Sequence, residues 1–150
     1  MKEITKCPST LALGYSAYSP IAIKRLFDGK KVSPYLGFEI EEIAQGKDAM
    51  LVMKRISVSG AQEKFPAVVD HGVIRLSEKG ERSWYILKPA PWDNTLYTRK
   101  QIPANEHLTM QIAAQVYGIA TAENGLCFTP KGEMVYITKR FDLAQDGSKY

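Results

Sequence analysis

The sequence predicts an α+β fold, in which one long helix packs on an antiparallel sheet and a small helical segment precedes both. From Met50 onward, short extended runs alternate with glycine-containing turns, a pattern typical of antiparallel strands. One longer stretch, residues 104–117, follows a helical period instead. We therefore divide the chain into a small N-terminal segment, residues 1–46, and a larger sheet-and-helix unit, residues 47–150.

The N-terminal segment is predicted to contain two short helices. Ser19 suits the N-cap of the first helix and Pro20 its first helical position, while Asp28-Gly29 ends it. The apolar face expected to be buried comprises Ile21, Ile23, Leu26 and Phe27. The second helix is predicted over residues 38–45. No chemical motif stands out in this segment.

The larger unit is predicted to be a sheet with one long helix. The expected strands span residues 51–58, 65–70, 73–77, 83–88, 126–129 and 135–140. His71-Gly72 is a tight-turn signal, so the strands on either side of it should form a hairpin. The long helix is expected to bury Leu108, Ile112 and Val116 against the sheet, and Gly118 ends it.

Charge and cysteine content narrow the class of protein. The net charge of +4 favours anionic partners such as nucleotide phosphates or nucleic acid, although a solvated surface with a small lysine excess explains it as well. Cys7 and Cys127 form no CxxC pair, so nothing supports a zinc site, and we expect Cys127 to be buried in a reducing, cytoplasmic protein. No apolar run approaches the ~18 residues of a membrane span, so no membrane partner is expected.

Two residues have the types and order of a phosphate grip. Lys88 ends the predicted strand Tyr85–Lys88, and Glu106 lies 18 residues later in the first turn of the long helix. In kinases a strand lysine holds the nucleotide phosphates and a helix glutamate orients it. Alternatively, Lys88 is an edge-strand lysine and Glu106 an acid that suits a helix N-terminus.

A glycine turn precedes these two residues. Gly60 lies in the stretch 57–64, between the strands predicted over residues 51–58 and 65–70. Backbone N–H groups of such a turn could face a phosphate. The stretch has one glycine, not the G-x-G-x-x-G pattern, and a plain β-turn fits it equally well.

Four pieces of the sequence together resemble the HipA kinase family. They are Ser57–Lys64 with SGAQEK at its centre, Ile86–Lys88, Pro103–His107, and Thr138–Asp142, in the family's order. The resemblance covers about residues 56–142. It implies a kinase-like N-terminal lobe, and the short region before it is more similar to compact HipT-like members.

The resemblance implies a role for each matching residue. Lys88 matches the lysine that binds the ATP phosphates, and Glu106 matches its helix partner. The loop that closes over the phosphates matches Gly60, Ala61, Gln62, Glu63 and Lys64. The hinge that receives adenine matches Lys139 and Phe141, with Asp142 near the ribose.

The same resemblance implies autophosphorylation of Ser57, or of Ser59 as in HipT-like members. A phosphate there would add ~−1.5 to −2 charge to a loop that holds ATP phosphates, and repulsion would displace the loop or the nucleotide. Alternatively, both are ordinary serines at a strand edge.

The resemblance further implies Mg-ATP as cofactor, a protein substrate that would be an aminoacyl-tRNA synthetase, and a HipB-like antitoxin through which nucleic acid is contacted only indirectly. A kinase also needs catalytic and magnesium-binding aspartates, and no H-x-D-x-x-x-x-N pattern occurs in the 150 residues. We therefore expect these ligands in a C-terminal lobe, no metal site in this chain, and no activity from the chain by itself.

Two other hypotheses remain open. The chain could be a stand-alone, non-catalytic half-kinase that binds and regulates a separate kinase or antitoxin. It could also be a basic α+β module that binds nucleic acid, although no interleaving of aromatic and basic residues supports this.

Overall fold

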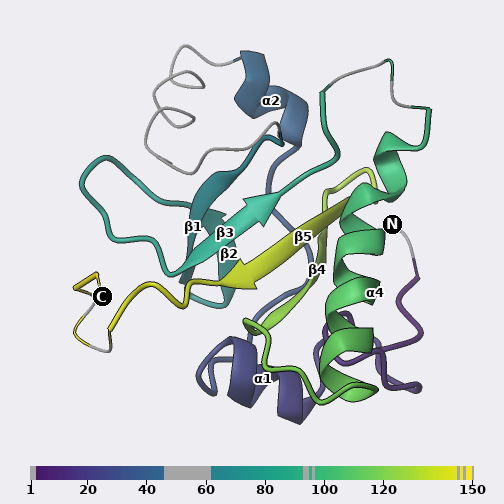
Figure 1. Ribbon diagram of the computed structural model, residues 1–150. Coiled ribbons are helices and arrows are strands. Elements are labelled where there is room, and N and C mark those ends of the chain that lie inside the picture. The colour runs from purple at the N-terminus through teal and green to yellow at the C-terminus, as the bar shows by residue number, and fades with distance from the viewer. Residues whose placement is uncertain are drawn as a thin grey trace.

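The computed structural model describes residues 3–45, 62–92, 95, 97–144, 146 and 148–149, and within them the chain is an α+β protein (Figure 1). The helical elements are α1 (Pro20–Leu26), α2 (Ile40–Gln45), the 3-10 turn η1 (Arg99–Gln101) and α4 (Ile102–Gln115). The strands are β1 (Phe65–Asp70), β2 (Val73–Leu76), β3 (Tyr85–Lys88), β4 (Asn124–Phe128) and β5 (Met134–Lys139). The strand predicted over residues 51–58 lies outside the described residues.

The described strands form one antiparallel sheet in the order β2-β1-β3-β5-β4. The hairpin predicted between β1 and β2 is confirmed, with His71 and Gly72 at φ 47° and 79° in its turn. Gly72 is required there, because a Cβ atom would also lie 3.0 Å from the carbonyl oxygen of Lys31. The long predicted helix and the strands on both sides of it are likewise present.

One face of the sheet packs against the N-terminal segment. The sheet contributes Phe65, Ala67, Ile74, Tyr85, Leu87, Cys127, Val135 and Ile137 to this core. The segment contributes Cys7, Tyr18, Ala22, Leu26, Phe27, Val32, Leu36 and Ile40. The two parts of the chain therefore share one hydrophobic core, and the buried position predicted for Cys127 is confirmed. The division at residue 46 stays a prediction.

Hydrogen bonds fix the segment on the sheet. The Tyr18 hydroxyl donates to the carbonyl oxygen of Leu126 at 2.7 Å, and the Tyr85 hydroxyl donates to that of Leu26 at 2.9 Å. Gly125 permits the close approach, because a Cβ atom on it would lie 3.2 Å from both Leu26 and Ser9. These bonds satisfy buried polar groups on both sides of the interface.

Helix α1 begins as the sequence predicts. The Ser19 side chain accepts a hydrogen bond from the backbone N–H of Ala22 at 3.3 Å, and Pro20 occupies the first turn. The predicted buried face is wrong at one position, since Ile21 is 57% exposed. Leu26 points into the core as predicted, and Ala22, four residues before it, takes the place expected for Ile21.

Helix α4 lies on the opposite face of the sheet, over β4 and β5 (Figure 1). Its predicted buried face is wrong. Leu108, Ile112 and Val116 are 48%, 42% and 71% exposed, whereas Pro103 and His107 are buried. The side of the helix that meets the sheet carries His107 and Gln111, and both form hydrogen bonds with Asn124 of β4.

In the described part of the chain, no helix has the length and apolar character needed to cross a membrane.

We expect the core position on α1 to control stability and the exposed one to be neutral. Leu26→Ala should lower the free energy of unfolding by about 2–5 kcal/mol, because Leu26 is fully buried. Ile21→Ala, on the same helix, should change it by less than about 0.5 kcal/mol. Urea titration followed by circular dichroism measures both, and equal losses would contradict the packing described above.

Candidate functional site

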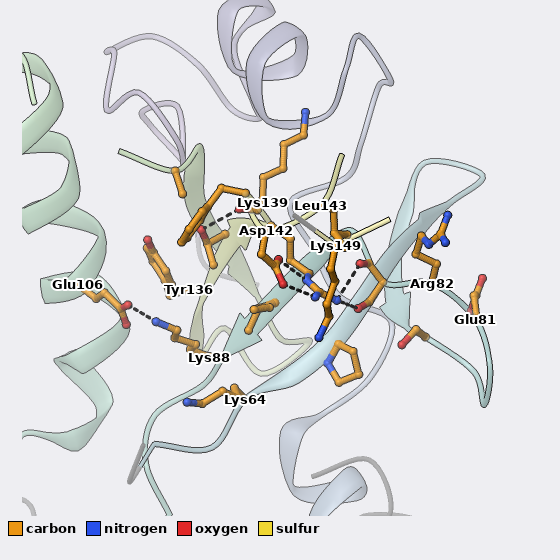
Figure 2. Close-up of a pocket in the computed structure, with 18 of the residues that line it drawn as sticks. Lys64, Glu81, Arg82, Lys88, Glu106, Tyr136, Lys139, Asp142, Leu143 and Lys149 are labelled. Atoms are coloured by element: carbon orange, nitrogen blue, oxygen red, sulfur yellow. Dashed lines mark hydrogen bonds and ion pairs between the residues drawn. The ribbon is translucent and has the colours of Figure 1, made fainter. Parts of the chain in front are cut away.

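A cleft of about 740 Å³ opens on the face of the sheet that carries α4 (Figure 2). Its floor comes from alternate residues of β3 and β5, Ile86, Lys88, Tyr136 and Thr138, and one wall comes from Glu106 and Met110 of α4. Charged side chains lie around this partly apolar floor. They include Lys64, Glu81, Arg82, Lys88, Glu106, Lys139, Arg140, Asp142 and Lys149.

The structure brings Lys88 and Glu106 together in this cleft. The Lys88 Nζ lies 2.6 Å from Glu106 Oε1, and both side chains are about one-quarter exposed. The pair joins the last residue of β3 to the first turns of α4, as Figure 2 shows. The neighbouring strand places Tyr136 directly opposite Lys88, and the Lys88 Nζ is 5.4 Å from the Tyr136 ring centroid.

Tyr136 remains a neutral phenol at physiological pH. Burial, and then the negative charge of Glu106, raises the pKa of Tyr136 to about 12. The ring therefore gives the cleft an apolar, electron-rich surface beside the Lys88 ammonium group.

Lys64 enters the cleft next to Lys88. Phe65 pairs with Leu87 in the antiparallel ladder. In an antiparallel pair this register places Lys64 opposite Lys88. Phe65 and Leu87 face the core, and Lys64 and Lys88 therefore face the cleft, as Figure 2 shows. Two lysines on one face make this end of the cleft suitable for an anion with several charges.

The side chains of Gln62 and Glu63 turn away from the cleft. The Gln62 Nε2 donates to the carbonyl oxygen of Pro89 at 3.2 Å, and the Glu63 carboxylate accepts the backbone N–H of Trp92 at 3.3 Å. These two hydrogen bonds hold the residues that precede β1 against the segment that follows β3. The remaining residues of the predicted loop and its serines, Ser57, Ser59, Gly60 and Ala61, lie outside the described residues.

The predicted hinge residues lie at the other end of the cleft, around the end of β5. The Lys139 Nζ pairs with Asp28 Oδ1 at 2.5 Å, and Phe141 is 81% exposed at the rim. Asp142 forms two hydrogen bonds with Arg140, from Nε to Oδ1 at 2.9 Å and from Nη2 to Oδ2 at 2.6 Å. These bonds hold the pKa of Asp142 below its usual range, so this carboxylate is ionised at neutral pH.

Sequence reasoning missed three residues of this region. Asp28 of the N-terminal segment pairs with Lys139, and Tyr136 lies under Lys88. Asn124 accepts a hydrogen bond from His107 of α4. Strand alternation could have placed Tyr136 on the same face as Thr138. The contacts of Asp28 and Asn124 join segments distant in the sequence, and no local pattern signals them.

His107 is a further case. It belongs to the HipA-like segment Pro103–His107, and its side chain is 1% exposed, packed between α4 and the sheet. Over the part of the chain that the structure describes, side chains of histidine, cysteine, aspartate and glutamate nowhere form a group of three that could hold a metal ion.

Comparison with known families agrees with the resemblance noted from the sequence. Residues 56–149 match the HipA-like C-terminal domain. The chain belongs to this family. The match includes all the described strands and α4, and it begins after α1 and α2. A search of curated proteins finds no match to the chain.

We expect the cleft pair to contribute little to the stability of this HipA-like domain. Lys88→Met should change the free energy of unfolding by less than about 1 kcal/mol, because partly exposed ion pairs are weak and Met keeps the aliphatic stem. Leu87→Ala, one residue earlier and fully buried, should cost about 2–5 kcal/mol. Chemical denaturation measures both, and a larger loss for Lys88→Met would assign that residue a structural role.

Proposed function

We propose that this chain is the ATP-binding, N-lobe-like part of a HipA-like serine/threonine protein kinase. The observation that carries the proposal is the contact between Lys88 Nζ and Glu106 Oε1 within the cleft. A lysine on a strand and a glutamate on a helix, paired over a sheet, form the arrangement with which kinases orient the nucleotide phosphates.

The cleft is suited to a nucleoside triphosphate. The ammonium groups of Lys88 and Lys64 favour negative charge at the end near α4, and Ile86, Met110 and Tyr136 provide apolar surface beside them. Glu106 accepts a hydrogen bond from Lys88 and thereby limits its rotation, so less conformational entropy is lost when phosphate binds. In this proposal the base lies toward the end of β5, near Lys139, Phe141 and Asp142.

ATP would supply the γ-phosphoryl group to a serine or threonine hydroxyl of a protein. Mg²⁺ accompanies ATP in such a reaction, and we expect its carboxylate ligands, with the catalytic aspartate, in a C-terminal lobe. The role of this chain is to bind, orient and neutralise the phosphates. Ser57 and Ser59 lie a few residues before Lys64 in the sequence. Autophosphorylation of either serine would oppose nucleotide binding by charge repulsion.

Family membership supports the biological context of the proposal. An aminoacyl-tRNA synthetase as target and a HipB-like antitoxin as partner are the expectations that follow from the resemblance, in a cytoplasmic toxin–antitoxin setting.

The proposal predicts that ATP binding depends on Lys88. Lys88→Met should weaken binding roughly tenfold to a hundredfold, which corresponds to one charge-assisted hydrogen bond of ~1.5–3 kcal/mol. The measurement is an NMR titration of the chain with ATP, in which saturable shifts give the dissociation constant.

The control is Lys100→Met, which removes an exposed lysine that pairs with Glu133 away from the cleft lining. It should bind ATP as the wild type does. Wild-type affinity in Lys88→Met, or no saturable shifts in the unmodified chain, would refute the proposed function.

A further inference from the structure

The contact between α4 and the sheet includes two polar side chains where an apolar face was expected. His107 and Gln111, one helical turn apart, both reach Asn124 of β4. The His107 Nδ1 and the Gln111 Nε2 each lie 2.9 Å from Asn124 Oδ1. We call these three residues the Asn124 node.

We propose that His107 is a positioning residue, whose hydrogen bond to Asn124 fixes the rotation of α4 and so holds Glu106 against Lys88. The inference rests on the proposed function, because it assigns His107 a role in preparing the same phosphate site.

The hydrogen bonds of the node have a defined direction. The Asn124 side-chain nitrogen donates to the carbonyl oxygen of Ala122 at 2.8 Å, so its oxygen faces the helix. His107 must therefore carry its proton on Nδ1 and donate it. Within the described residues, its buried Nε2 has no hydrogen-bond partner, and burial lowers the pKa of His107, so the ring is neutral.

Two donors on one acceptor restrain the helix more than one would. A single bond leaves α4 free to turn about that point, whereas donors at His107 and Gln111 lie along one line of the helix surface. The exposed residues Leu108, Ile112 and Val116 do not fix the rotation of the helix on the sheet. Pro103 is buried and Met110 lines the cleft, but apolar contacts of this kind have little directional preference. The two hydrogen bonds to Asn124 are directional, and they therefore restrain the rotation of the helix more closely.

The node and the ion pair lie on the same face of the sheet. Lys88 pairs with Tyr136, which pairs with Leu126, and Asn124 lies two residues from Leu126 on β4. Residues two apart on a strand share a face. Glu106 directly precedes His107, so a rotation of α4 that broke the bond to Asn124 would also move the Glu106 carboxylate away from Lys88.

Two substitutions at His107 separate positioning from packing. His107→Asn places an amide donor where Nδ1 stood but removes ring volume. His107→Phe keeps the ring volume and removes the donor. If the hydrogen bond matters, ATP affinity should fall about tenfold in His107→Phe and stay within about threefold of wild type in His107→Asn. A role in packing alone gives the reverse order and overturns the inference.

The NMR titration with ATP is run on both variants, with Thr109→Ala on the exposed side of α4 as the control that should bind normally. Lys88→Met is included in the same series. Wild-type affinity in both Lys88→Met and His107→Phe means that the proposed function has failed. Wild-type affinity in His107→Phe, with weakened binding in Lys88→Met, overturns the positioning role only.

If His107→Phe does not fold, Gln111→Met replaces it, because Gln111 is only partly buried and supplies the second donor. Severalfold weaker ATP binding then supports the node. Binding equal to that of the wild type contradicts it.

Discussion

The contact between Lys88 and Glu106 is the interaction on which the site depends. It joins the end of β3 to the first turns of α4, and both charges are partly removed from water. Because the desolvation of such charges offsets much of their attraction, the pair needs a rigid frame on both sides to hold its geometry. β3 is a central strand of the sheet, and the Asn124 node anchors the helix.

The two faces of the sheet differ in chemistry, one supplying the hydrophobic core and the other the cleft for which we propose nucleotide binding. One face is apolar and is covered by the N-terminal segment, so it supplies the hydrophobic core. The other carries lysines, a neutral tyrosine and a polar helix contact, and it forms the cleft. The segment also reaches the cleft end of β5, where Asp28 pairs with Lys139. Substitutions on the first face should therefore change stability, and those on the second should change binding.

Local signals allowed much of the fold to be predicted. The Ser19 cap, the His71-Gly72 turn and the alternation along the strands are short-range features, and the elements that they predict within the described residues are present. The buried side of α4 was not predictable, because the hydrogen bonds of His107 and Gln111 to Asn124 form only when the helix and β4 are brought together by the tertiary fold. The same applies to the site. The order of the motifs predicted that Lys88 and Glu106 would meet, whereas the partners of Gln62 and Glu63 depend on the tertiary fold.

Affinity labelling with an acyl-phosphate derivative of ATP tests the central claim most directly. In this reagent a carboxyl carbon is bonded to the terminal phosphate, and a nearby lysine amine attacks it to form an amide and release ATP. Peptide mass spectrometry then locates the modified lysine. The account predicts labelling at Lys88 or its neighbour Lys64, suppressed by excess ATP. The account would be contradicted if the reagent modified the most exposed lysines, such as Lys100 and Lys131, and if excess ATP did not suppress this labelling.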